Sequence, residues 1–475
     1  MPCTSAFTPI HTFMLMVWVP LLISWAWNTQ GAPEYAEVKE FPGFDGQLPS
    51  KHFAGYITVG NQPHKRHLYY YFATSERNPS KDAVLLWING GPACSGLDAL
   101  MHQHGPLKII DDVTTRRGPV KLISNPFSWS QIANIIYVDS PAGTGYSYAD
   151  SDGDYITNDT KTVSDLYEFT LKFFAEYPEF LPNPLYLAGC SYSGVIVPVL
   201  AQEIVIGNEA GNNLNLNFKG YALGNAAIDI DIENNGRVPF AHRMGLISDE
   251  LYEDLTSSCR GNYWKNTDPD CLKNLEAFHV NIEGINTDHV LCLPCKFELG
   301  LCLKPNCYDS DQKEYSLPQN SEYDSIHCHI FNTNQKRLLD LETTRQTLHA
   351  VPVKISGEWV RCANTKLNYQ RDIFSLIPYH LNLTSKGYRA FIYCGDHDMI
   401  IPYTATMEWI KALNYSVIKG WHPWFVDGSI VGYNVQYDHN LLFATFKGAG
   451  HTVSQYMPRE ALIAYQRWID GAGSL

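Results

Sequence analysis

Positive charge is scarce in this chain of 475 residues, which has 35 Lys and Arg residues against 49 Asp and Glu residues. The formal net charge of −14 at pH 7 argues against a nucleic-acid partner, because phosphate backbones bind basic surfaces. Internal repeats are absent as well, so the chain does not consist of repeated units. Hydrophobic residues make up 45% of the sequence, which is enough to bury a full α/β core with an insertion.

Long apolar runs are also lacking. Residues 13–27 form an apolar stretch that is broken by Pro20 and preceded by no Lys or Arg, and it is short for a membrane span. Small residues follow at Gly31 and Ala32. We interpret residues 1–31 as a cleaved signal peptide rather than a membrane anchor, and expect the secretory pathway with the vacuole or the extracellular space as destination. Three glycosylation acceptor triplets fit this route; they begin at Asn158, Asn382 and Asn414.

A Gly- and Ser-rich turn between two apolar runs is the most informative feature that is present. Residues 184–188 predict a buried strand and residues 195–200 a helix, with Gly189-Cys190-Ser191-Tyr192-Ser193-Gly194 between them. This is the layout of a nucleophile elbow, the strand–turn–helix that presents a serine. Ser193 stands where the generic pattern has glycine, so a Ser/Gly-rich turn of another α/β protein is the alternative.

Two later segments carry an acid and a histidine in the chain order that α/β-hydrolases require. Residues 389–394 predict a buried strand that leads into Gly395-Asp396-His397-Asp398. Residues 441–446 predict another strand, followed by Gly448-Ala449-Gly450-His451. An acid at a strand end can orient a histidine that swings over the sheet edge to the serine. The pattern predicts a Ser–acid–His triad.

Paired glycines after a further apolar strand, residues 83–88, suggest an oxyanion hole. The following residues are Asn89-Gly90-Gly91-Pro92. Backbone N–H groups in such a loop can converge on a developing alkoxide, and we predict the N–H groups of Gly91 and Tyr192 as the pair. A simple tight turn is the alternative interpretation of the same residues.

These motifs together resemble those of a known family. The stretch Trp87-Ile88-Asn89-Gly90-Gly91-Pro92-Ala93-Cys94-Ser95 resembles the WLNGGPGCSS motif of the serine carboxypeptidases. Residues 139–148 resemble their D-x-P-x-G-x-G-[FY]-S-Y segment, residues 189–194 their GESYAG, and residues 448–451 their GAGH. The match runs from about residue 35 to the C-terminus. Residues 395–399 and 423–428 resemble most the plant subgroup that contains acyltransferases.

The resemblance implies the fold and the roles of the triad residues. We expect an α/β-hydrolase fold with a central, mostly parallel sheet and an inserted helical cap that contains cysteines. The nucleophile is then Ser191, the base His451 and the acid Asp398, whose spacing to Pro402 is the family's usual one. Asp396 is the alternative acid. No cofactor, metal or nucleotide is required.

The loss and return of strand periodicity suggest where the insertion lies. We predict a core in two parts, residues 32–234 and 356–475, and a cap over residues 235–355. Within the cap, residues 308–324 are polar and acidic and read as an exposed linker. Members of the family are often cut in this segment, so a two-chain form is expected.

Departures from the family pattern bear on the substrate. Carboxypeptidases of the family hold the free carboxylate of a peptide with an Asn of the glycine loop, here Asn89 beside Gly90, and with two Glu residues that share a proton. Cys190 and Gln103 occupy those Glu positions here. A thiol is a weak donor, and neither residue can form the shared-proton pair. Acyltransferases of the family carry Asp at the position of Cys190, so this residue matches neither subgroup.

We therefore predict an acyltransferase that moves an acyl group from a 1-O-acyl glucose ester to an alcohol acceptor through an acyl-enzyme on Ser191. A carboxypeptidase acting on peptides is the alternative, and a non-catalytic binding member of the family is a third interpretation. Cys190 is a less favoured candidate nucleophile, because the elbow directs Ser191 toward the site.

The 12 cysteines indicate disulfides in a secreted protein. Cys3 lies in the predicted signal peptide, which leaves an odd number and hence at least one free thiol. Cysteines 292, 295, 302 and 307 have zinc-like spacing, but the secretory setting favours bridges. By the resemblance, Cys94 pairs with Cys328 and Cys259 pairs with Cys271.

Overall fold

The computed structural model of the chain describes residues 32–110, 118–211, 214–292, 295–296, 301–302, 333–363, 367–471 and 475. The predicted signal peptide, residues 1–31, and the predicted linker, residues 308–324, lie outside the described residues. No helix of the described part is long and apolar enough to cross a membrane.

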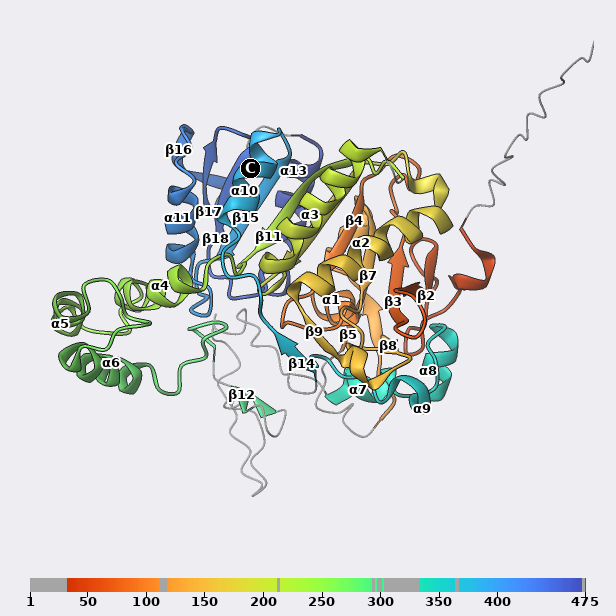
Figure 1. The fold of residues 1–475 in the computed structure, drawn as a ribbon, viewed down its shortest axis with the longest axis horizontal. Helices are drawn as coiled ribbons and strands as arrows, with labels where there is room; N and C mark the ends of the chain where they lie inside the picture. Colours follow the sequence, from red (N-terminus) through yellow and green to blue (C-terminus); the bar gives the residue numbers. More distant parts are fainter. Residues whose placement is uncertain are drawn as a thin grey trace, which may run out of the picture. The chain divides into compact units, whose positions relative to one another are not determined.

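One mixed sheet of 12 strands organises the described residues (Figure 1). In spatial order the strands are β1 (Glu37–Val38), β2 (His52–Val59), β3 (Arg66–Ala73), β7 (Asn134–Val138), β4 (Val84–Ile88), β10 (Leu185–Cys190), β11 (Phe218–Gly224), β15 (Arg389–Gly395), β18 (Leu441–Phe446), β17 (Ser429–Tyr437) and β16 (Val417–Val426), and β8 (Tyr148–Ala149) pairs with β3. The strands from β7 to β18 are parallel, and the flanking pairs are antiparallel. The predicted mostly parallel sheet of an α/β-hydrolase is confirmed.

Helices cover both faces of this sheet, because successive side chains of a buried strand point to opposite sides. On β4, Val84, Leu86 and Ile88 belong to one hydrophobic cluster, and Leu85 and Trp87 to another. The first cluster includes side chains of α2 (Asp159–Glu176), α3 (Ser193–Ala210), α10 (Ile377–Ser385) and α11 (Tyr403–Ala412). The second includes side chains of α1 (Gly96–His102) and α13 (Pro458–Ile469).

The chain between β11 and β15 adds no strand to the main sheet among the residues described there. Besides α10, its described helices are α4 (Ile230–Arg243), α5 (Asp249–Cys259), α6 (Pro269–Ile282), α7 (Thr333–Leu339), α8 (Glu342–Thr347) and α9 (Val353–Ser356). Small strand pairs are β12 (Cys295–Lys296) with β13 (Leu301–Cys302), β14 (Asn368–Gln370) with β9 (Ile156–Asn158), and β5 (Leu107–Ile109) with β6 (Leu122–Ser124). The remaining elements are η1 (Glu34–Ala36), η3 (Trp129–Gln131), η4 (Asp152–Tyr155), η5 (Pro178–Phe180) and α12 (Val453–Tyr456). A helical insertion was expected here, and its boundaries at residues 235 and 355 stay a prediction.

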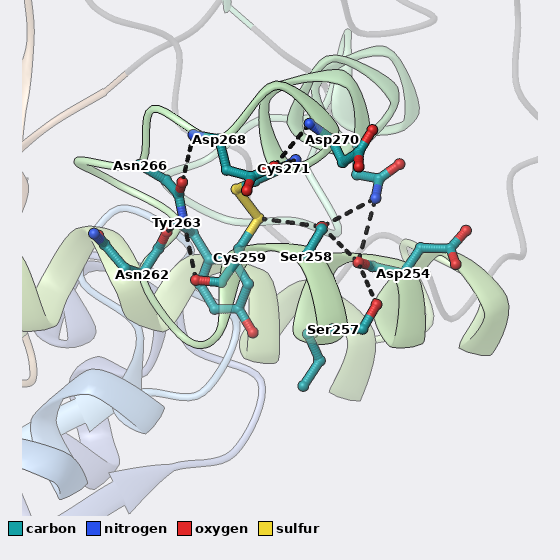
Figure 2. Close-up of a disulfide and its surroundings, with 12 residues drawn as sticks. Asp254, Ser257, Ser258, Cys259, Asn262, Tyr263, Asn266, Asp268, Asp270 and Cys271 are labelled. Carbon is teal, nitrogen blue, oxygen red and sulfur yellow. Dashed lines mark hydrogen bonds between the residues drawn. A yellow bond between two sulfur atoms is a disulfide. The ribbon is translucent and has the colours of Figure 1, made fainter.

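Helices α5 and α6 form a hairpin that is closed by the disulfide Cys259–Cys271 (Figure 2). The Asn266 side-chain amide donates to the Cys259 carbonyl (3.0 Å), and Asp268 caps α6 by accepting from the backbone N–H of Asp270 (2.9 Å). This is the second pairing that the family resemblance implied. The hairpin shares a small core with Met399, which follows β15, so the insertion packs next to the loop that carries Asp398.

The expected pairing of Cys94 with Cys328 is wrong, because Cys94 is bonded to Cys362. The two segments form an antiparallel bridge in which the Ser95 N–H donates to the Arg361 carbonyl (2.7 Å). These backbone contacts bring Cys362 next to Cys94, and Cys328 lies outside the described residues. Cys292 is also disulfide-bonded, which favours bridges over zinc in that part of the chain. In the described residues, no cluster of His, Cys, Asp or Glu could hold a metal ion.

Candidate active site

Ser191 lies in the sharp turn between β10 and α3. Its φ of 59° is in the left-handed region, which costs a non-glycine residue roughly 1–3 kcal/mol. Neighbouring backbone groups hold this conformation: the Ser191 N–H donates to the Gly224 carbonyl (3.0 Å), and the Ser191 carbonyl accepts from the N–H groups of Gly194 (3.0 Å) and Ala227 (2.9 Å). The turn therefore has the strained, supported backbone of a nucleophile elbow.

Close packing explains the small residues around Ser191. A Cβ atom on Gly189 would lie 2.3 Å from the Ile88 carbonyl oxygen, and one on Gly194 would lie 2.5 Å from the Ala227 carbonyl oxygen. Ser193, which replaces the glycine of the generic pattern, is buried and donates its hydroxyl hydrogen to the Cys190 carbonyl (2.8 Å). The departure at Ser193 is therefore compatible with the elbow.

The structure brings His451 and Asp398 together at the ends of β18 and β15. His451 Nδ1 lies 2.7 Å from Asp398 Oδ2, and Asp398 is fully buried. The same carboxylate accepts hydrogen bonds from the Asn225 amide (2.8 Å) and from the backbone N–H of Ile400 (2.8 Å). These donors hold the carboxylate in place, aimed at the histidine ring.

Asp396, the alternative acid, has other partners. Its Oδ1 atom lies 2.5 Å from His397 Nδ1 and accepts a hydrogen bond from the backbone N–H of Gly448 (2.7 Å). Asp396 thus joins the loop after β15 to the loop after β18. The geometry favours Asp398 over Asp396 as the partner of His451.

Nearby negative charges raise the pKa of His451 by more than burial lowers it. Burial lowers the pKa of His451, but the charge of Asp398, the hydrogen bond to it and the charge of Asp288 raise that pKa to about 9. Asp288 comes from the inserted segment, and burial raises its own pKa while His451 opposes that shift. The imidazolium that forms when His451 takes a proton is therefore well stabilised.

The loop that follows β4 lies directly against the elbow. A Cβ atom on Gly90 would lie 2.7 Å from Ser191 Cβ and 3.0 Å from the Tyr192 backbone nitrogen, and Gly91 has a φ of 114°. Within the described part of the chain, the backbone N–H groups of Gly91 and Tyr192 donate no hydrogen bond to a protein acceptor. Both predicted oxyanion donors are thus left for another acceptor, on segments that touch each other.

The three predicted substrate-binding side chains meet beside this loop. Asn89 Oδ1 lies 3.5 Å from Gln103 Nε2 and 3.8 Å from Cys190 Sγ, and all three residues are buried. Asn89 also donates its amide hydrogen to the Ser95 carbonyl (3.0 Å). We name Asn89, Gln103 and Cys190 the amide–thiol cluster. It contains no ionisable carboxyl group.

The thiol of this cluster stays neutral. Burial raises the pKa of Cys190 to about 12, although a hydrogen bond from the Gly90 backbone opposes the shift. A thiolate is the nucleophilic form of cysteine, so Cys190 is poorly suited to attack a substrate. This supports Ser191 over Cys190 as the nucleophile.

Sequence reasoning missed the support behind Tyr192. The Tyr192 hydroxyl donates to Asp159 (2.9 Å), and the same buried carboxylate accepts from the hydroxyl of Tyr369 (2.8 Å) and from the backbone N–H groups of Asp372 and Ile373 (2.9 and 3.0 Å). In the sequence, Asp159 stands out only as the middle residue of the glycosylation triplet that begins at Asn158. Its long-range contacts have no local signal in the sequence.

Asn225 was missed as well, although it follows the buried strand β11. It is fully buried, and besides binding Asp398 it accepts a hydrogen bond from the Gly395 N–H (2.9 Å). A polar residue directly after a strand of the parallel sheet is a signal that would have found it, because ligands and catalytic groups gather at the carboxyl ends of such strands.

The three glycosylation triplets lie in different surroundings. Asn414 is exposed. The Asn382 amide on α10 donates to Gln202 on α3 (3.0 Å), and the Asn158 side-chain oxygen caps α2 by accepting from the Lys161 N–H (2.8 Å). Asn414 is therefore the most accessible acceptor of the three.

Comparisons with known proteins point to one family. The sequence model described as serine carboxypeptidase matches residues 42–471. The chain is 44% identical to serine carboxypeptidase 1 of Hordeum vulgare over 93% of this chain and 94% of that protein. It is 39% identical to serine carboxypeptidase-like 20 of Arabidopsis thaliana over 98% and 99% of the two chains. A crystal structure of Kex1(delta)p, a prohormone-processing carboxypeptidase from Saccharomyces cerevisiae, is similar in fold, with a TM-score of 0.70 at 20% identity over 92% of this chain and 95% of that one.

Proposed function

Since the chain belongs to the serine carboxypeptidase family, we propose that it is an acyltransferase of that family, which moves an acyl group from a 1-O-acyl glucose ester to an alcohol. The observation that carries this proposal is the amide–thiol cluster beside Ser191. A peptidase of this kind must grip a free carboxylate, whereas a neutral sugar ester makes no such demand. The absence of a carboxyl pair weakens the first activity and leaves the second untouched.

In the proposed reaction Ser191 Oγ attacks the acyl carbon while His451 takes the hydroxyl proton. The N–H groups of Gly91 and Tyr192 donate to the oxyanion, and Asp398 holds the protonated imidazole through its Nδ1–H. Collapse of the tetrahedral intermediate breaks the bond to the sugar oxygen, which leaves with the proton from His451. The alcohol then attacks the acyl-enzyme while His451 takes its proton. As the bond between the acyl carbon and Ser191 Oγ breaks, His451 returns this proton to Ser191 Oγ and the ester product leaves.

The alternative is a carboxypeptidase, and the name of the barley relative at 44% identity favours it. Under that proposal Asn89 and Gln103 would hold the peptide carboxylate with neutral amide groups. A missing charge-assisted hydrogen bond costs about 1.5–3 kcal/mol, which corresponds to roughly a ten- to hundredfold loss in peptide turnover. We therefore rank acyl transfer first.

Intact-protein mass spectrometry tests the proposal. Purified protein incubated with a panel of acyl glucoses is expected to gain the mass of one acyl group on Ser191 and to pass it to an added alcohol. Ser191→Ala is the matched control and should gain no mass. Failure of every acyl glucose to acylate the protein, together with release of C-terminal residues from blocked dipeptides, would favour the peptidase.

We also propose that the protein follows the secretory route after loss of residues 1–31, carries sugar on Asn414, and is cut within residues 308–324 to give two chains. The candidate active site would then draw Ser191 from one chain and Asp398 and His451 from the other. The disulfide Cys94–Cys362 would join the two chains covalently.

A further inference from the structure

A short piece of the insertion crosses the two loops that carry the acid and the base. Residues 287–290, which we name the strap, make three backbone hydrogen bonds to these loops. The Met399 N–H donates to the Thr287 carbonyl (2.9 Å), the Val290 N–H donates to the His397 carbonyl (3.0 Å), and the His451 N–H donates to the Asp288 carbonyl (2.7 Å). The strap therefore joins the loop after β15 to the loop after β18.

Packing at this crossing is tight. A Cβ atom on Gly450 would lie 2.4 Å from the Asp288 carbonyl oxygen and 2.7 Å from His289 Cβ. A Cβ atom on Gly395 would lie 2.1 Å from the Gly450 carbonyl oxygen. Glycines at these positions let the strap and both loops approach to backbone contact, so a shift of the strap is transmitted to His451.

His289 is the side chain that fixes the strap to the base loop. It is fully buried, its Nε2 atom lies 3.1 Å from the Gly448 carbonyl oxygen, and its Nδ1 atom accepts from the Leu291 backbone N–H (3.3 Å). A carbonyl oxygen can only accept and an N–H can only donate, so Nε2 carries the proton and Nδ1 is bare. The ring packs edge-on against Tyr456, with 4.7 Å between the centroids.

We propose that His289 is a positioning residue for the reaction: its neutral ring ties the strap to residues 448–451 and so holds His451 against Asp398. The inference rests on the proposed role of His451 as the general base. His289 does not touch the reacting atoms and acts through the base loop.

The groups around His289 favour the neutral ring. Burial lowers the pKa of His289, and the His397 ring, 5.5 Å away between centroids, lowers it further, while the Gly448 carbonyl and Asp396 oppose the shift. Asp396 is engaged by His397 and by the Gly448 N–H. Protonation at Nδ1 would set two N–H groups of His289 and Leu291 against each other and break their bond.

Three variants separate the two hydrogen bonds of the ring. In His289→Gln the side-chain amide can still donate to Gly448, in His289→Asn the side-chain oxygen can still accept from Leu291, and His289→Leu can do neither. The probe is a fluorophosphonate, which reacts with an activated serine whatever the natural substrate is. Its rate of reaction with Ser191 is measured against pH in the full-length mature protein.

The wild-type rate should rise with pH to a plateau through the pKa of His451, about 9. We expect His289→Asn and His289→Leu to lower the plateau by about tenfold and to move the midpoint toward the ordinary histidine value near 6.5, because the base loop no longer holds His451 on Asp398. His289→Gln should restore most of the rate and the midpoint. His380→Gln is the matched control, since His380 is also fully buried and bonds Tyr221 on β11 (2.7 Å); it should lower thermal stability without moving the midpoint.

An unchanged midpoint and plateau in His289→Asn and His289→Leu, with thermal stability alone reduced, would overturn the inference. If wild-type Ser191 does not react with the probe, the proposed function fails instead. Hydrogen exchange then tests whether His289 holds the base loop. Faster exchange in residues 448–452 of His289→Asn than of His289→Gln would then support the link between strap and base loop. Equal exchange in the two variants would overturn it.

Discussion

The two sides of the candidate active site are held by different forces. On the Ser191 side, glycines allow the loop after β4 and the elbow to approach so closely that a Cβ on Gly90 would lie 2.7 Å from Ser191 Cβ, and the neighbouring amide–thiol cluster is uncharged. On the His451 side, a buried carboxylate, a histidine with a raised pKa and a strap from the insertion meet through hydrogen bonds. Steric fit therefore positions the proposed nucleophile and oxyanion donors, whereas charge and hydrogen bonding position the proposed acid and base.

This difference has a consequence for pH and mutation. The Ser191 side should tolerate changes of pH but not of side-chain volume. The His451 side should respond to pH and to the loss of single donors or acceptors. Each variant below tests one side against the other.

The largest effect is expected from a change of the proposed nucleophile. Ser191→Ala should lower acyl transfer by on the order of 10⁶-fold, since the acyl-enzyme cannot form, while the thermal midpoint stays close to that of the wild type. Cys190→Ala, the neighbouring small change, should keep measurable turnover. If Ser191→Ala were active and Cys190→Ala inactive, the assignment of Ser191 as the nucleophile would be wrong.

Asp398→Asn tests the charged side. Turnover should fall by about 10⁴-fold, because the amide no longer stabilises the imidazolium or fixes its tautomer. Asp396→Asn serves as the matched carboxylate, and its loss of turnover should be far smaller. Comparable losses in the two variants would mean that the acid has not been identified.

The same pair predicts a pH dependence of stability. The pKa of His451 in the folded protein, about 9, is above its ordinary unfolded value near 6.5. The pair therefore stabilises the fold fully below pH 6.5, and this contribution is lost as the pH rises through 9. In thermal melts, the wild-type advantage over Asp398→Asn should shrink between these pH values; an advantage that grows with pH would contradict the assignment.

Gly90→Ala tests the steric side. The added methyl group has to displace Ser191 or the Tyr192 N–H, so we expect turnover to fall by about 10²–10³-fold at every pH, as when an oxyanion donor is lost. Gly420→Ala on the exposed strand β16 is the control, because nothing lies within 4 Å of its Cβ position. A Gly90→Ala enzyme with normal kcat would show that the loop is not part of the oxyanion hole.

A smaller effect is expected behind the oxyanion donor. Tyr192→Phe and Tyr369→Phe each remove one phenol from the buried Asp159 carboxylate. Only the first phenol belongs to the residue whose backbone N–H is the proposed oxyanion donor. We expect kcat to fall about three- to tenfold in Tyr192→Phe, with similar losses of stability in both variants. Equal kcat values for the two variants would show that the bond from Tyr192 to Asp159 does not support the oxyanion hole.

The contrast between the two sides also explains what the sequence could predict. The elbow, the glycine loop and the ends of β15 and β18 are short contiguous patterns, so Ser191, Gly91, Asp398 and His451 can be predicted as site residues without a structure. The strap and Asp159 were not, because their contacts join segments far apart in the chain. Cys94 was paired with the wrong cysteine for the same reason: the bridge to residues 361–363 exists only in the folded chain.

The central claim is that the amide–thiol cluster turns this family's chemistry away from free carboxylates. It is tested most directly by the ratio of kcat/KM for a blocked dipeptide to kcat/KM for an acyl glucose with an alcohol acceptor. The ratio is compared between the wild type and the double variant Cys190→Glu with Gln103→Glu. We predict a low ratio for the wild type and a rise of about tenfold or more in the variant at acidic pH, where two adjacent carboxyl groups can share a proton and hold a carboxylate. Efficient C-terminal trimming by the wild-type protein, without transfer from any acyl glucose, would contradict the account.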